Sequence, residues 1–284
     1  MTEPEVVVGG LAFGEGPRWH DGRVWFSDMH DHAVKTFDPA TSRLERIVEV
    51  EGSPSGLGWD RDGRLVVVSM DDRRLLRFDG DTLSEIADLS QYTPHPINDM
   101  VVSATGVAYI GSFGFDLHAG EQPTTTVVLA VDLASGVHRV AADELRFPNG
   151  MVITTDDSTL IVAESFGGCL TAFTIADAGA LTDRREWAAL EGGAMPDGIC
   201  LDAEGCVWVS SPATREFLRV KAGGSVLERV SASDRLAIAC MLGDDDRRSL
   251  YLLTSKGLDP SKAAELRTGR LERVRVAVPG AGRP

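Results

Sequence analysis

The stretch P-N-G-M-V-I-T-T-D-D-S-T-L-I-V-A-E-S, residues 148–165, contains two apolar runs separated by a polar turn. One run follows Gly150, the turn contains Asp156-Asp157, and the second run begins at Leu160. Two β-branched runs around such a turn are typical of a β-hairpin. Taken alone, Pro148-Asn149-Gly150 is typical of another turn, because Pro fixes φ and Gly supplies positive φ. The rest of the chain changes that interpretation.

The same pattern occurs at five other places in the chain. Each copy starts with a small or polar residue, then has an apolar-rich run, a turn that is usually acidic or glycine-containing, and a β-branched and aromatic run. The other copies are residues 14–28, 54–69, 97–112, 196–211 and, in a weaker form, 237–254. Repeats of about 40–50 residues that supply four strands each are typical of a β-propeller.

Further strand patterns complete most of these units, and helical periodicity is limited to Pro260–Leu266. The additional strands are expected at 33–38, 74–79, 127–132, 169–175 and 217–220. Six units fill the chain, so the sequence predicts an all-β, six-bladed β-propeller of four-stranded blades around a central channel, as one domain over residues 1–284. We expect Glu5–Val8 to complete the last blade beside Arg270–Val276. An open solenoid would need polar capping repeats, which the sequence lacks.

Composition and charge exclude several classes of protein. The net charge is −15 and the basic residues are scattered, which argues against nucleic-acid binding. The acidic N-terminal segment and the short apolar runs predict neither a secretory signal nor a membrane partner. The four cysteines lack zinc-site spacing and indicate reduced thiols in a cytoplasmic protein. We expect a monomer or homodimer that acts on a small molecule. The cysteines are Cys169, Cys200, Cys206 and Cys240.

The lead residues of the six units are the candidate site. In a propeller the innermost strand of each blade lines the channel, so equivalent positions form one ring. Four of the six bear side-chain oxygens suited to a hard cation, and two of these are carboxylates, which would repel each other without a cation between them. Such a set suits calcium, magnesium or manganese, whereas the alternative is a group of channel-lining polar residues bridged by water. The ring is Glu15, Ser55, Asn98, Asn149, Asp197 and Ala239.

The segments that follow the second strand of each hairpin are predicted to surround the mouth of the channel on the side of the ring. They are mostly apolar, and we expect Phe113, Phe115, Phe166 and His30 to contact substrate. A surface-loop role is the alternative for His30, as it is for His95 and His118. The segments are 28–30, 70–71, 113–115, 165–166 and 212.

With these motifs in this order, the chain resembles the senescence marker protein/gluconolactonase/regucalcin-like family of six-bladed propellers over nearly its whole length. The resemblance implies a divalent cation held by Glu15, Asn149 and Asp197, with Asn98 contributing to the metal or the substrate. It implies calcium first, with magnesium, manganese or zinc as alternatives, and lactonase activity on sugar lactones. The motifs are G-E-G-P-R-W (14–19), I-N-D (97–99), P-N-G-M (148–151), P-D-G-I-C-L-D-A-E-G-C-V-W-V (196–209) and G-R-L-E-R-V (269–274).

One position departs from the family pattern. Sugar-lactone members often place Arg two residues before the Asn of the I-N-D motif, where this chain has Pro96. A polyhydroxylated substrate needs many hydrogen-bond partners, so the departure and the apolar mouth indicate a less polar lactone or ester.

The resulting hypothesis is metal-assisted hydrolysis of a lactone, with Asp197 as general base or, alternatively, as nucleophile. A serine hydrolase is disfavoured because no G-x-S-x-G motif is present, and a calcium buffer because no EF-hand pattern is present. A non-hydrolytic or phosphotriesterase-type enzyme at the same site remains an alternative. A binding propeller with a structural cation is another.

Overall fold

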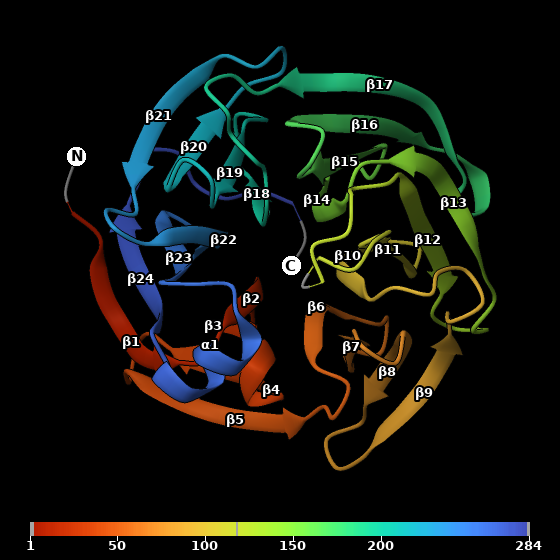
Figure 1. Ribbon diagram of the computed structural model, residues 1–284, viewed down its shortest axis with the longest axis horizontal. Coiled ribbons are helices and arrows are strands. Elements are labelled where there is room, and N and C mark those ends of the chain that lie inside the picture. The colour runs from red at the N-terminus through yellow and green to blue at the C-terminus, as the bar shows by residue number, and fades with distance from the viewer. Residues whose placement is uncertain (1–2, 118, 283–284) are drawn as a thin grey trace.

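The computed structural model describes residues 3–117 and 119–282, which form six four-stranded antiparallel sheets around a central channel (Figure 1). From inner to outer strand, the first two blades are β2 (Gly14–His20), β3 (Arg23–Asp28), β4 (Ala33–Asp38), β5 (Arg43–Glu49) and β6 (Pro54–Trp59), β7 (Leu65–Ser69), β8 (Arg74–Phe78), β9 (Leu83–Asp88). The next two are β10 (Ile97–Val102), β11 (Val107–Ser112), β12 (Thr126–Asp132), β13 (His138–Leu145) and β14 (Pro148–Ile153), β15 (Thr159–Glu164), β16 (Cys169–Ile175), β17 (Leu181–Ala189). The last two are β18 (Ile199–Leu201), β19 (Val207–Ser211), β20 (Glu216–Val220), β21 (Val226–Ser231) and β22 (Leu236–Gly243), β23 (Ser249–Ser255), β24 (Gly269–Arg275), β1 (Glu5–Leu11). The predicted six-bladed, all-β propeller is confirmed.

The last blade joins the two ends of the chain. β1 supplies its outer strand and pairs antiparallel with β24, from Glu5 opposite Arg273 to Leu11 opposite Gly269. Figure 1 shows this pairing as the red strand beside the blue one. The predicted closure is therefore confirmed, and the ring cannot open without breaking this strand ladder.

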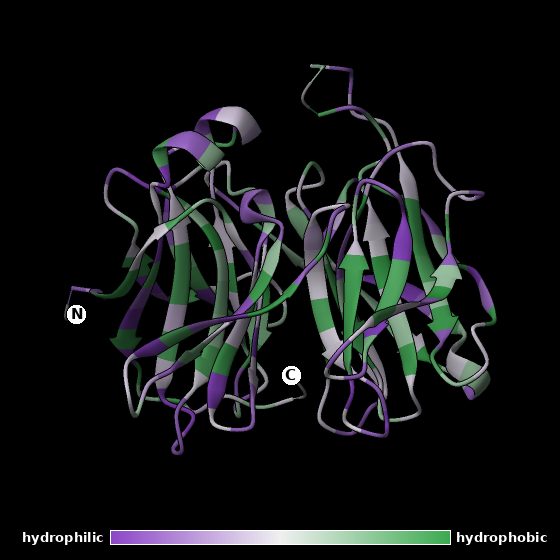
Figure 2. Cartoon of the chain, turned by 90° about the horizontal axis from the view of Figure 1, so that it is seen from below, coloured by the Kyte–Doolittle hydropathy of each residue, from purple (hydrophilic) through white to green (hydrophobic). Residues whose placement is uncertain are grey.

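The core lies between the blades. Every residue of the second strands β7, β11 and β23 is buried, whereas the outer strands β5, β9 and β17 are largely exposed or half-buried. Figure 2 accordingly shows hydrophobic residues concentrated on the strands and hydrophilic ones on many of the connections. Because both faces of each blade pack against a neighbour, the second strands are continuous apolar runs, as in Leu65–Val68, rather than alternating ones.

Helical elements are few. The helix α1 (Pro260–Leu266) coincides with the predicted helical stretch and lies between β23 and β24. Among the described residues, two single-turn 3₁₀ helices, η1 (Met29–Asp31) and η2 (Asp177–Gly179), complete the secondary structure. Across residues 3–117 and 119–282, no helix has both the length and the apolar character needed to cross a membrane.

The four cysteines, Cys169, Cys200, Cys206 and Cys240, are free thiols, as the sequence predicted. Cys200 on β18 has its Sγ atom 3.8 Å from Sγ of Cys240 on the neighbouring β22, rather than facing Cys206 across the hairpin.

The six inner strands approach each other closely at the level of the lead residues. Each contacts the next around the channel, and β22 meets β2. A Cβ atom on Gly150 would lie 2.5 Å from the Asp197 carbonyl oxygen and 2.6 Å from the Ile199 nitrogen. One on Gly198 would lie 2.4 Å from Cβ of Ala239. Glycine after the lead residues Asn149 and Asp197 is thus required by the small space between neighbouring blades.

This spacing explains the P-N-G sequence. Pro148, Asn149 and Gly150 are the first three residues of β14, and the register with β15 is irregular between Pro148 and Met151. The turn suggested by these three residues alone is therefore wrong. Gly150 is needed because the neighbouring blade approaches its backbone closely, and Asn149, the second residue of the strand, lines the cavity.

The glycine contact gives a testable stability difference. Gly150→Ala should lower the free energy of unfolding by about 1–3 kcal/mol, because the new Cβ would collide with backbone that cannot move independently. Gly9→Ala is the matched control, since a Cβ there meets no described heavy atom within 4 Å. Urea unfolding of both variants measures the difference. Equal stability of the two variants would contradict close packing of the inner strands.

Candidate metal centre and cavity

The four oxygen-bearing lead residues predicted as ligands line one cavity at an end of the channel. The cavity has a volume of about 640 Å³. Glu15, Asn98 and Asn149 are the second residues of β2, β10 and β14, and Asp197 lies two residues before β18. Glu15, Asn98 and Asn149 are buried, and Asp197 is half-buried where it faces the cavity. The structure thus brings together residues separated by up to 182 positions (197 − 15).

Hydrogen bonds orient the two amide side chains. Ser165 Oγ accepts a hydrogen bond from Asn149 Nδ2 at 3.2 Å and donates one to the Pro196 carbonyl oxygen at 2.7 Å. With its nitrogen held there, Asn149 keeps Oδ1 as its acceptor atom. Ser55 Oγ donates to Asn98 Oδ1 at 3.3 Å, which gives the ring position Ser55 a role in holding a neighbouring ring residue.

The charges of the set fit a hard cation. Asp197 Oδ1 is buried and has no hydrogen-bond partner among the described residues. An unpaired buried carboxylate oxygen is costly unless an ion or proton satisfies it. Among the described residues, no three His, Cys, Asp or Glu side chains cluster in a way that could hold a metal ion. The donor set at this cavity instead combines two carboxylates with two amides. Oxygen-only sets of this kind suit calcium, magnesium or manganese better than zinc.

Burial and neighbouring negative charge act together on the two carboxyl groups. Burial, with the charge of Asp99, raises the pKa of Asp197 to about 8, and the Asn149 amide partly offsets this rise. Burial, followed by the charges of Asp197 and Asp99, raises the pKa of Glu15 well above its usual range. A bound cation would relieve this repulsion by supplying the missing positive charge.

Sequence reasoning missed the charged pair beside the ring. Arg18 Nη2 donates to Asp99 Oδ1 at 2.9 Å, and both side chains are almost fully buried. In a regular strand Asp99 would point away from its neighbour Asn98. The register of β10 is irregular between Ile97 and Met100, however, and Asp99 remains within electrostatic reach of Glu15 and Asp197. Two adjacent polar residues in a strand otherwise fully apolar were the available signal.

The raised pKa values give an expected pH dependence. The folded state holds the Asp197 proton more tightly than the unfolded state, so stability is lost as pH rises from about 4 to about 8 in protein stripped of cations. Glu15 acts in the same direction. Because calcium needs the ionised carboxylates, the rise in Tm that it produces should be larger at pH 8 than at pH 5. Thermal unfolding with EDTA or calcium measures this, and a calcium effect that shrinks toward pH 8 would contradict it.

The predicted mouth segments do line the cavity, with one correction. Met29, His30, Met70, Phe113 and Phe166 contribute, as do Asp71, Ser165 and Pro212. Phe115 does not line it: this side chain is 2% exposed and packs behind Phe147 and Phe166, with ring centroids 5.7 and 5.2 Å away. His118 lies outside the described residues, and His95 is not among the lining residues.

Several residues that line the cavity were not anticipated, and two of them are aromatic. Phe147 and Phe13 line the cavity from the positions that precede β14 and β2. Only the segments after the second strands had been assigned to the mouth, so residues entering the inner strands were overlooked. The ring of Phe13 lies 5.3 Å from that of His30.

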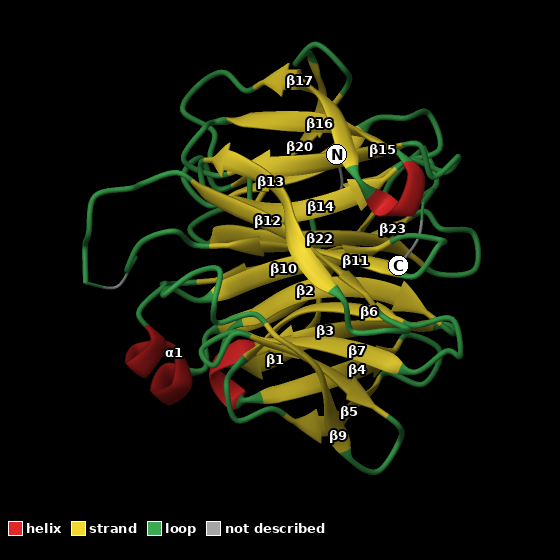
Figure 3. Cartoon of the chain, turned by 90° about the vertical axis from the view of Figure 1, so that its right-hand side faces the viewer, coloured by secondary structure: helices red, strands yellow, loops and turns green. Residues whose placement is uncertain are grey.

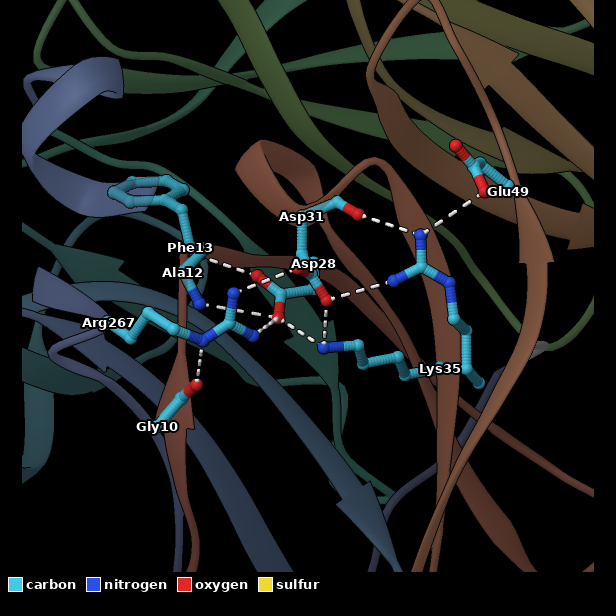
Figure 4. A network of polar contacts seen from close by, with 9 residues as sticks. Gly10, Ala12, Phe13, Asp28, Asp31, Lys35, Glu49 and Arg267 are labelled. Carbon is cyan, nitrogen blue, oxygen red and sulfur yellow. Dashed lines mark hydrogen bonds and ion pairs between the residues drawn. The ribbon is translucent and has the colours of Figure 1, made fainter. Parts of the chain in front are cut away.

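A polar network, buried at Asp28 and Lys35, fixes this wall (Figure 4). Asp28 accepts hydrogen bonds from the Phe13 nitrogen at 2.7 Å and from Lys35 Nζ at 2.7 Å. Lys35 also reaches Asp31 at 2.6 Å, and Arg267, which ends α1, donates to Asp31 at 2.8 Å. α1 contacts η1 (Figure 3), and both supply residues that line the cavity, so the network ties the helix to the wall that carries Phe13.

Comparison with known proteins agrees with this architecture. Residues 13–256 match the model of the family described as SMP-30/Gluconolactonase/LRE-like region. A 6-deoxy-6-sulfogluconolactonase of Pseudomonas putida is 25% identical, with 95% of this chain and 94% of that protein covered. The structure of a luciferin-regenerating enzyme superposes with a TM-score of 0.84 at 19% identity, covering 98% of each chain. That of a calcium-binding protein, regucalcin, from Agrobacterium tumefaciens gives 0.82 at 19% identity, covering 100% and 96%.

Because these two solved structures are only 19% identical to the chain, their similarity shows a shared fold and no more. The family match spans most of the sequence, including all four candidate ligands. The chain therefore belongs to the SMP-30/gluconolactonase/LRE-like family.

Proposed function

We propose that this protein is a divalent-cation-dependent lactonase that opens a small lactone ring by attack of water. The observation that carries the proposal is the meeting of Glu15, Asn98, Asn149 and Asp197 in one cavity, with Asp197 Oδ1 buried and unpaired among the described residues. The name of the Pseudomonas putida relative, a lactonase, supports the reaction class. The regucalcin structure, described as calcium-binding, supports the choice of cation.

Two of the four residues would supply negative charge to a cation, and the other two would supply neutral oxygen ligands. Together they would hold a divalent cation, which would supply Lewis-acid chemistry toward the ester carbonyl and the developing oxyanion. Glu15 and Asp197 provide the negative charge of the site. Asn98 and Asn149 provide oxygens without further charge, and the hydrogen bonds from Ser55 to Asn98 and from Asn149 to Ser165 keep them in position.

Asp197 is suited to the proton transfers. Water oxygen forms a bond to the carbonyl carbon while its proton passes to Asp197, and the ring C–O bond then breaks as that proton passes to the leaving alkoxide oxygen. Burial raises the pKa of the Asp197 carboxyl to about 8, and a positive charge nearby would lower that pKa. Such a carboxyl can accept and return a proton near neutral pH. The apolar wall of Phe and Met side chains limits solvent access and so strengthens these electrostatic interactions.

Reconstitution tests the reaction class. Protein stripped with EDTA is supplied separately with calcium, magnesium, manganese or zinc and assayed on lactones and on an organophosphate triester. The proposal expects turnover of lactones that is absent without cation and restored by calcium. Cation-restored hydrolysis of the triester alone would indicate a phosphotriesterase, and cation binding without any turnover would indicate a binding propeller.

A further inference from the structure

The cavity is divided into a polar end and an apolar wall. The four candidate ligands form the polar end, and much of the remaining lining is Phe, Met, Leu, Pro and Ala. Among the described residues, neither Lys nor Arg lines the cavity. A volume of about 640 Å³ is within the range of sites that enclose whole small molecules, so there is room for more than a bare lactone ring.

Several polar groups on the wall already have partners. Ser53 Oγ donates to Asp71 at 2.7 Å, and Ser165 is engaged by Asn149 and Pro196. A sugar lactone brings several hydroxyl groups, and each one buried without a partner weakens binding. An apolar substituent, in contrast, gains from every methylene that the wall removes from water.

Phe147 packs against two other aromatic residues of the apolar wall. Its ring lies 4.5 Å from that of Phe113 and 5.4 Å from that of Phe166, measured between centroids. Its backbone is left-handed, with φ of 62°, a conformation that is unfavourable for a bulky residue. Ser53, which precedes Pro54 as Phe147 precedes Pro148, has φ of 63°.

The backbone conformation and the side chain at position 147 have separate explanations. The left-handed residue before the inner-strand proline recurs in two blades, so it belongs to the way the chain enters the strand. Gly or Asn would adopt it more readily than Phe. The ring of Phe147, two residues from Asn149, is therefore explained by what it contributes to the cavity.

We propose that the substrates are lactones carrying an alkyl or aryl substituent, and that Phe113, Phe147 and Phe166 are specificity-determining residues that bind this substituent. The ester group lies at the candidate ligands and the apolar body extends along the wall toward the mouth. This inference rests on the lactonase function proposed above and names its substrate class.

A homologous series of substrates tests the inference. We would measure kcat/KM of the calcium-reconstituted protein for γ-butyrolactone, for γ-lactones with linear side chains from methyl to pentyl, for dihydrocoumarin and for glucono-δ-lactone. The expected result is a rise of about fourfold for each added methylene until the wall is covered, with glucono-δ-lactone below the pentyl lactone. A flat series, or preference for glucono-δ-lactone, with turnover still dependent on calcium, overturns the substrate class and leaves the lactonase standing.

Substitutions in the apolar wall test which residues bind the substituent of the lactone. Phe147→Ala removes a buried ring and can fail to fold, so Phe166→Ala, at a half-buried position, is the principal variant. It should lower the ratio of kcat/KM between the pentyl lactone and γ-butyrolactone by at least tenfold. Leu258→Ser, at an exposed residue that lines the cavity, should lower it by about threefold, whereas Leu266→Ser, 63% exposed and outside this lining, should leave it unchanged. Unchanged ratios in both wall variants overturn the assignment.

Binding of analogues covers the case in which no lactone is turned over. The corresponding γ-lactams resist hydrolysis, and their dissociation constants are measurable by calorimetry. If the lactonase proposal fails but lactam affinity still rises with side-chain length and falls in Phe166→Ala, the wall is a binding site for apolar substituents. If affinity is independent of the side chain, the inference fails as well.

Discussion

Asp197→Asn should reduce kcat/KM for the best lactone substrate by roughly 10²–10⁴-fold. The substitution removes the proposed proton acceptor and one of the two negative charges of the site while keeping the side-chain volume. Calcium affinity should fall for the same reason. Steady-state kinetics at saturating calcium separates loss of the base from loss of the cation.

The same variant should keep its fold. Burial and the charge of Asp99 raise the pKa of Asp197 to about 8, so the cation-free protein at neutral pH already carries an uncharged side chain there. Asn imitates that state, and the Tm in EDTA should be unchanged or higher. Asp245→Asn makes the same chemical change at an exposed turn residue and serves as control. Turnover within tenfold of wild type in Asp197→Asn would exclude this carboxylate as the base.

Arg18→Met should lower the free energy of unfolding by about 3–5 kcal/mol, the cost of removing one partner of a buried ion pair. Arg18 is 4% exposed, and its guanidinium donates to Asp99 at 2.9 Å, to the Leu57 carbonyl oxygen at 3.1 Å and to that of Pro17 at 2.8 Å. Without Arg18, the Asp99 charge would be buried near Glu15 and Asp197 with nothing to offset it. Urea unfolding in EDTA measures the loss.

A second substitution checks the cause. If the uncompensated charge dominates, Arg18→Met combined with Asp99→Asn should be more stable than Arg18→Met alone. The double variant still lacks the hydrogen bonds to backbone carbonyls, so it should not reach wild-type stability. A double variant no more stable than the single one would show that Arg18 stabilises the protein through those carbonyls and not through Asp99.

Much of the architecture could be predicted because each blade is local in sequence. The predicted strands at 33–38 and 169–175 coincide with β4 and β16, and the predicted helix with α1. Alternation and turn residues decide such hairpins within a few dozen residues. The four candidate ligands could be placed together from the sequence because equivalent positions of the repeats become neighbours in space when the blades close into a ring. These residues are far apart in the chain.

What escaped prediction depends on backbone irregularity. The register shift after Ile97 leaves Asp99 close to the ring, against the alternation expected of a strand. The left-handed conformation of Phe147 places its ring in the wall, while Phe115, which the sequence assigned to the mouth, packs behind it. The alternation of a strand predicts neither irregularity, although the adjacent polar residues Asn98 and Asp99 in an otherwise apolar strand were a signal of the first.

The most direct test of a catalytic cation site at this ring is a titration of turnover. Protein stripped of cations at a concentration far above the calcium dissociation constant receives calcium stepwise, and lactone hydrolysis is measured after each addition, with Asp197→Asn treated alike. Activity should rise linearly from zero and level off at one calcium per chain, with no comparable rise in the variant. Turnover that is already complete in EDTA, or that rises equally in Asp197→Asn, would contradict it.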